Sequence, residues 1–155
     1  MSQLKAKGKP VTGIFEASIA TSLQIIGPHE KFGIVSTGKV WEQVLTEAVK
    51  DFLGSGKEMS RRFAGVETTG LNATELHGAP PEEVRTRMKE ATRWLVRKGN
   101  VGAICLGCAG MAGMNEMVRE AAIEELGEDK GRCVRIVDGV QAGIAWLEGA
   151  VRTEF

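Results

Sequence analysis

The stretch Val101-Gly102-Ala103-Ile104-Cys105-Leu106-Gly107-Cys108-Ala109-Gly110-Met111 decides the fold of this chain. Its first six residues form an apolar run, which predicts a buried strand over 101–106. Glycine and alanine then flank Cys108, and such small residues let another molecule approach the backbone closely. A helical spacing of apolar residues begins near Ala112. Cys108 is therefore predicted to lie in a tight turn between a strand and a helix.

A thiol in this position has two interpretations. In open α/β sheets, ligands bind at the carboxyl ends of the strands. Free N–H groups at the start of a helix favour an anion such as a thiolate or a bound carboxylate, and the thiolate is the reactive form of cysteine. The alternative is that Cys108 is one more buried small residue, as we expect for Cys105. The place of Cys108 in the turn favours a functional role.

The composition predicts one domain in a reducing compartment. With 155 residues, the chain is long enough for a single domain with a real core. It has 20 Lys and Arg against 20 Asp and Glu, so no basic surface for nucleic acid is predicted. Three cysteines, no secretory leader and no apolar run of membrane length predict a cytoplasmic protein without a membrane anchor. The CxxC of Cys105 and Cys108 lacks a second ligand pair nearby, so no metal site is predicted.

Apolar segments alternate between strand and helix spacing along the chain. Strands are predicted over 10–15, 32–35, 62–68, 101–106 and 133–137, and helices over 16–26, 40–53, 82–98, from about 112, and 140–151. Residues 69–81 and 127–132 are expected to be loops, and residues 1–9 a mobile terminus. The alternation implies parallel βαβ units. We therefore predict one α/β domain over 10–155, an open parallel sheet with helices on both faces.

Further candidate residues lie at the ends of predicted elements. Ser36, Thr37 and Gly38 follow the strand over 32–35 and could bind a carboxylate or ureide, although a plain helix N-cap is the commoner role of Ser and Thr. Glu16 and Ser18 are candidate substrate-binding residues at a helix start.

Asp138 could orient a ligand or cap the helix that follows it. His77 lies in the loop over 69–81. Such loops often act as lids, but we favour a solvated loop histidine there. His29 carries little functional weight.

Leu106-Gly107-Cys108-Ala109-Gly110-Met111 resembles the second catalytic-cysteine motif of the hydantoin and allantoin racemases, within the aspartate/glutamate racemase superfamily. Other segments resemble the same family, namely Pro10–Ser18, Gly33–Thr37 and Val137–Val140. The resemblance implies one lobe of a fold that has two pseudo-symmetric lobes, each a parallel sheet with helices. Residues 10–15 would then be the strand that crosses between lobes, and residues 140–151 the closing helix.

In that family one cysteine from each lobe flanks the stereocentre of the substrate. One thiolate removes the α-proton and the other thiol donates a proton from the opposite face, with no cofactor or metal. The resemblance assigns only Cys108 to this pair, and we expect the other cysteine to lie in a lobe absent from this chain. A developing enolate also needs hydrogen-bond donors, and we expect the backbone N–H groups of Ala109 and Gly110 to supply them.

The leading hypothesis is thus a cofactor-independent racemase or epimerase of a small carbonyl compound, such as a hydantoin or allantoin. The alternatives are a single-cysteine decarboxylase or isomerase of the same superfamily, and a non-catalytic lobe that binds a ligand.

The closing helix over 140–151 predicts self-association. Val140, Ile144 and Leu147 share one apolar face, which in the resembling family packs on the other lobe. Without that lobe the exposed apolar surface favours a second copy of the chain. We therefore expect a homo-oligomer, most simply a two-fold dimer. The alternative is a monomer whose closing helix folds back on its own sheet.

Overall fold

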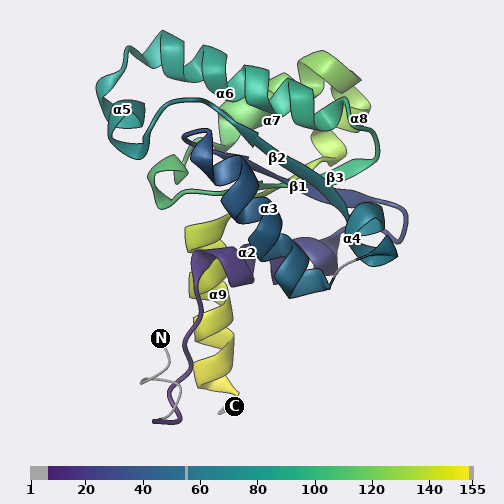
Figure 1. Ribbon diagram of the computed structural model, residues 1–155, viewed down its shortest axis with the longest axis vertical. Helices are drawn as coiled ribbons and strands as arrows, with labels where there is room; N and C mark the ends of the chain where they lie inside the picture. The colour runs from purple at the N-terminus through teal and green to yellow at the C-terminus, as the bar shows by residue number, and fades with distance from the viewer. Residues whose placement is uncertain (1–6, 55, 154–155) are drawn as a thin grey trace.

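A computed structural model describes residues 7–54 and 56–153 of the protein (Figure 1). At its centre lies a four-stranded parallel sheet in the order β2-β1-β3-β4. The strands are β1 (Lys31–Ser36), β2 (Phe63–Thr68), β3 (Val101–Leu106) and β4 (Arg135–Asp138). The predicted parallel sheet is confirmed, and β3 has the predicted bounds.

Helices connect the strands and cover both faces of the sheet (Figure 1). They are α2 (Ile14–Ile25), α3 (Val40–Leu53), α4 (Lys57–Arg62), α5 (Ala73–Gly78), α6 (Pro81–Val96), α7 (Asn115–Leu126), α8 (Glu128–Cys133) and α9 (Gly139–Arg152), with one 3-10 turn, η1 (Ala109–Met111). Within the described ranges, no helix has both the length and the apolar character needed to cross a membrane.

The core lies on both sides of the sheet because successive strand residues point to opposite faces. Phe32 and Ile34 of β1 pack with residues of α2 and α3, whereas Val35 packs with residues of α6 and α7. Gly33 lies between them, and a Cβ at this position would come within 2.6 Å of a methyl carbon of Leu95 on α6. The close approach of α6 to the central strand therefore requires glycine at position 33.

The strand predicted over 10–15 is not formed. Residues 10–13 have no regular secondary structure, and Ile14 and Phe15 begin helix α2. The reason is that the apolar spacing continues at helical intervals into Ile19, which is fully buried against the sheet. The other part of the predicted N-terminal arrangement, a mobile terminus over 1–9, lies mostly outside the described residues.

Two predicted loops contain short helices. Residues 73–78 of the predicted loop over 69–81 form α5, and most of residues 127–132 belong to α8. Cys133, predicted to begin the last strand, is instead the last residue of α8 and is exposed. Short polar helices of this kind lack the apolar periodicity on which helix prediction depends.

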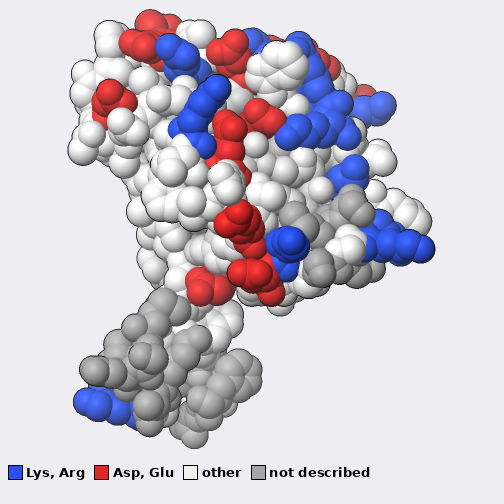
Figure 2. All heavy atoms as spheres, viewed as in Figure 1, with Lys and Arg blue, Asp and Glu red and all other residues white. Residues whose placement is uncertain are grey.

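A row of ion pairs joins α6 to α7. Lys89 and Arg93 both bind Glu124, and Arg97 binds Glu125 at 2.7 Å. Figure 2 shows positively and negatively charged side chains interspersed over the α6 side of the molecule. The hydrogen bond from Lys89 lowers the pKa of Glu124, and the hydrogen bond from Arg97 lowers that of Glu125.

We expect these carboxylates to stabilise the protein at neutral pH and to lose that effect in acid. A lowered folded-state pKa stabilises the fold above the ordinary value of 4.5, and the stabilisation is lost as pH falls through the folded-state pKa. The Tm difference between the parent and a Glu124→Gln, Glu125→Gln variant, measured by circular dichroism, should be present at pH 7 and shrink progressively as the pH falls below 4.5. A difference that does not change with pH would contradict this.

Candidate functional site

The carboxyl ends of the two central strands, β1 and β3, lie side by side. Val35 pairs with Leu106, and the N–H of Gly107 donates to the carbonyl of Val35 at 2.8 Å. The turn over 36–38 therefore meets the turn over 107–110 at one edge of the sheet. This is the edge at which open α/β sheets bind ligands.

The hydroxyl of Ser36 is buried at this edge without a hydrogen-bond partner in the described structure. Its side chain is 1% exposed. Gly107 lies against it, since a Cβ on Gly107 would be 3.1 Å from the Ser36 Oγ. An unpaired buried hydroxyl costs about 1–3 kcal/mol. A hydrogen-bonding ligand beside Gly107 would remove that cost.

Neither Ser36 nor Thr37 is the N-cap of the helix that follows, which was the alternative to a binding role. The N-cap of α3 is Lys39, and no side chain caps that helix end. Thr37 is buried, and its carbonyl accepts hydrogen bonds from the N–H of Gly70 at 3.0 Å and the hydroxyl of Thr69 at 3.3 Å. The end of β2 thus holds the backbone of the turn after β1.

Helix α5 lies across the two turns and supplies residues that sequence reasoning assigned to a loop. A Cβ on Gly38 would be 2.8 Å from Oδ1 of Asn72, which precedes α5. A Cβ on Gly110 would be 3.2 Å from Nε2 of His77 and 3.6 Å from Sγ of Cys108. His77 therefore belongs to the site.

The signal that locates α5 is the Asn72–Glu75 spacing, which is typical of a helix start. The N–H of Asn72 donates to a carboxylate oxygen of Glu75 at 2.7 Å, and Leu76 is buried.

Cys108 is half-buried, with extended backbone at φ −141° and ψ 137°. It precedes the single turn η1 and not an α-helix, because Gly113 adopts a left-handed φ of 82° and α7 begins only at Asn115. The expectation that Cys108 lies at an α-helix start is thus wrong. The expected stabilisation of a thiolate by a helix dipole does not apply to it.

Cys105 lies three residues before Cys108, inside β3, and we expect its thiol to be unreactive. Burial raises the pKa of its thiol to about 12, although a hydrogen bond with Ser22 at 3.0 Å acts in the opposite direction. Iodoacetamide at pH 8 should therefore modify half-buried Cys108 and exposed Cys133 but spare Cys105. Peptide mass spectrometry measures this, and unfolded protein, in which all three thiols react, is the control. Equal labelling of Cys105 and Cys133 in folded protein would refute it.

Asp138 caps α9 and is tied to the loop behind Cys108. Its Oδ1 accepts from the N–H groups of Val140 at 2.8 Å and Gln141 at 3.2 Å. Its Oδ2 accepts from the N–H of Gly113 at 3.3 Å. The capping alternative for Asp138 is therefore confirmed.

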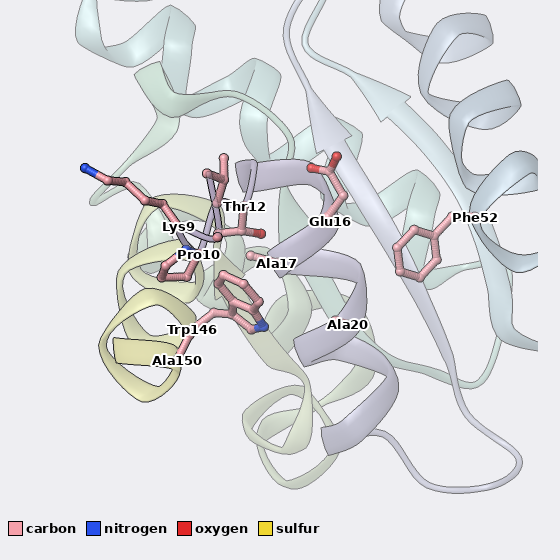
Figure 3. Close-up of a pocket in the computed structure, with 11 residues that line it drawn as sticks. Lys9, Pro10, Thr12, Glu16, Ala17, Ala20, Phe52, Trp146 and Ala150 are labelled. Atoms are coloured by element: carbon pink, nitrogen blue, oxygen red, sulfur yellow. The ribbon is translucent and has the colours of Figure 1, made fainter. Parts of the chain in front are cut away.

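Ser18 lines a small cavity of about 30 Å³ with Leu106 and Gly107, the two residues before Cys108. The hydroxyl of Ser18 donates to the carbonyl of Ile14 at 2.5 Å. Glu16 lines a separate cavity of about 470 Å³ together with Phe52 and Trp146 (Figure 3), and Cys108 is not among the residues that line it. Their roles in substrate binding stay predictions. No cluster of three or more His, Cys, Asp or Glu side chains suited to a metal ion occurs in the described ranges.

Residues 3–147 match the family model described as Asp/Glu/Hydantoin racemase. The hydantoin racemase of Pseudomonas sp. (strain NS671) is 28% identical over 92% of this chain and 50% of its own length. An uncharacterized protein of Schizosaccharomyces pombe is 34% identical over 93% of this chain and 54% of its own length. The chain thus spans about half the length of the curated relatives it matches.

Two solved structures resemble the fold. The allantoin racemase from Pseudomonas fluorescens superposes with a TM-score of 0.71 at 28% identity, covering 94% of this chain and 54% of that one. The allantoin racemase from Klebsiella pneumoniae superposes with a TM-score of 0.68 over 98% of this chain and 56% of that one. At 24% identity the second likeness supports the fold alone.

Proposed function

Because the chain belongs to the Asp/Glu/hydantoin racemase family, we propose that it supplies one half of a cofactor-independent racemase or epimerase site. In this proposal Cys108 transfers the α-proton of a small carbonyl compound. The observation that carries the proposal is the position of Cys108 at the carboxyl end of central strand β3, directly after Gly107, which lies against a buried Ser36 hydroxyl that has no partner in the described structure.

Removal of a proton next to a carbonyl needs a base at close range and donors for the enolate oxygen. The Cys108 thiolate would be the base. The N–H groups of Ala109 and Gly110 follow it directly in the chain and would be the donors. The turn of Ser36, Thr37 and Gly38 would hold the polar part of the substrate, with the Ser36 hydroxyl gaining the partner that it lacks.

The names of two relatives, a hydantoin racemase and an allantoin racemase, suggest the substrate class. Both names point to a cyclic ureide with an acidic hydrogen beside a carbonyl. A planar ring of this kind offers carbonyl oxygens and N–H groups to a serine hydroxyl and to backbone N–H groups.

Isotope exchange tests the proposal, since exchange needs one working base. The chain is incubated in heavy water with one enantiomer of a 5-monosubstituted hydantoin or with allantoin, and loss of the α-hydrogen signal is followed by proton NMR against buffer alone. We expect exchange above the buffer rate. Carbon dioxide release from an arylmalonate would support the decarboxylase instead. Saturable hydantoin binding without exchange would indicate the non-catalytic lobe.

We further propose that the partner of this chain is a second copy. Helix α9 extends away from the sheet beside α2 (Figure 1), and its residues Ile144 and Val151 are 61% and 66% exposed. The relatives are about twice as long as the matched part of this chain, so two copies together supply a comparable number of residues. A pair would also contribute a second Cys108.

A further inference from the structure

The imidazole of His77 and the thiol of Cys108 both lie close to the position that a side chain on Gly110 would occupy. A Cβ placed there would lie 3.2 Å from Nε2 of His77 and 3.6 Å from Sγ of Cys108. Gly110 has no left-handed backbone angle that would require glycine. Glycine at this position therefore keeps the space between an imidazole and a thiol open.

His77 is held in place by its helix. The carbonyl of Asn72 accepts from the N–H of Leu76 at 2.9 Å, and the buried side chain of Leu76 anchors α5 to the core beside Met111 of η1. His77 itself is exposed.

In the described ranges, three titratable side chains besides His77 lie on or next to α5 and η1, namely Glu75, Glu83 and Cys108. Glu75 on α5 accepts a hydrogen bond from the N–H of Asn72. Glu83 of α6 lines a shallow hollow together with Glu75 and Thr74 on α5. On η1 and the residue before it, Cys108 is the titratable group.

We propose that His77 is a second acid–base residue of this site, which takes the proton of Cys108 and so produces the thiolate. This inference rests on the proposed function. The S–H bond of Cys108 breaks and its proton moves to Nε2 of His77. The thiolate then forms a new S–H bond to the α-hydrogen of the substrate, and the electron pair of the broken C–H bond moves into the carbonyl to give an enolate. The reverse steps return both protons, so nothing is oxidised or reduced.

Imidazole suits this role because it is the side chain that most often exchanges a proton near neutral pH. A cysteine with an imidazolium beside it is more fully ionised at neutral pH than an isolated cysteine, and its thiolate reacts faster with alkylating agents. The pairing therefore has a readout that needs no substrate.

The test measures the rate at which iodoacetamide alkylates Cys108. All proteins carry Cys133→Ser, which removes the exposed thiol, and Cys105 is protected by burial. The variants are His77→Ala, His77→Gln and, as the matched control, His29→Ala, which removes the other histidine of the chain. Rates are taken from intact-protein mass spectra between pH 5.5 and 9, and circular dichroism confirms that each variant is folded.

At pH 7 we expect about a tenfold slower alkylation in both His77 variants and no more than about a twofold change in His29→Ala. The rates should converge above about pH 9, where cysteine ionises without assistance. Equal rates for His77→Ala and His29→Ala at pH 7 would overturn the inference.

The two proposals fail in different measurements. Slow alkylation of the His77 variants combined with no hydantoin exchange by the parent chain would support the His77–Cys108 pair and refute the proposed function. Hydantoin exchange combined with unchanged alkylation would support the function and refute the pair.

Discussion

Cys108→Ser should reduce α-proton exchange by this chain at least about a hundredfold, which is the lower bound for losing a general base. A serine hydroxyl ionises far less readily than a thiol and is not an effective base without activation. Cys108 is half-buried, and oxygen replaces sulfur with little change in shape, so the fold should be unaffected. The measurement is the NMR exchange rate in heavy water, with Tm as the check on folding.

Cys133→Ser is the matched control for this result. The substitution is chemically the same, but Cys133 lies beside Val101 and Gly102 at the amino end of β3, the edge of the sheet opposite to Cys108. The control should exchange at the parent rate. Exchange by Cys108→Ser at that same rate would remove Cys108 from the reaction.

The chain should run as a dimer, with about twice the 16.7 kDa mass of one chain at micromolar concentration. The apolar residues Ile144 and Val151, seven positions apart on one face of α9, are 61% and 66% exposed. An exposed apolar face of this kind is typical of a protein interface, and a two-fold axis lets one such face bind its own copy. Light scattering coupled to size exclusion measures the mass.

Ile144→Asp tests whether α9 forms that interface, because it places a charge at the centre of the apolar face. We expect this variant to elute with the mass of one chain. Trp94→Asp is the control, since Trp94 is 55% exposed on α6, which covers the other face of the sheet. A monomeric parent would refute the dimer. A dimeric Ile144→Asp variant would exclude α9 from the interface.

The sheet and its main helices were predictable because their apolar patterns are long and regular. Residues 101–106 are apolar throughout, as expected of a parallel strand buried on both faces, and the structure places β3 at the same residues. The helix over 40–53 was likewise predicted with its observed bounds. Ser36 and Cys108 each follow one of the predicted strands, so their place at the carboxyl edge of the sheet was predictable too.

The remaining differences arise where the pattern is short or ambiguous. Residues 14 and 15 fit a strand after Pro10 as well as the first turn of a helix, and packing of α2 on the sheet decides between them. The sequence places His77 in a solvated loop because α5 is only six residues long. Its one buried apolar residue, Leu76, is too little to show the spacing typical of a helix. The proximity of His77 to Cys108 depends on how α5 packs against η1, a contact between segments far apart in the sequence.

The position of β1 inside the sheet has a consequence for the order in which the chain folds. Its partner β2 follows after α3 and α4, but its other partner, β3, arrives only after α5 and α6. The pairing of β1 with β3 closes a long loop and is slow, because the chain loses conformational entropy before the strand contact compensates for it. During synthesis, β1 and β2 are therefore made well before β3, and the apolar edge of β1 is open to pairing with other chains in that interval. Chaperone dependence and aggregation should be decided in this interval, before the strand that carries Cys108 to the site has been made.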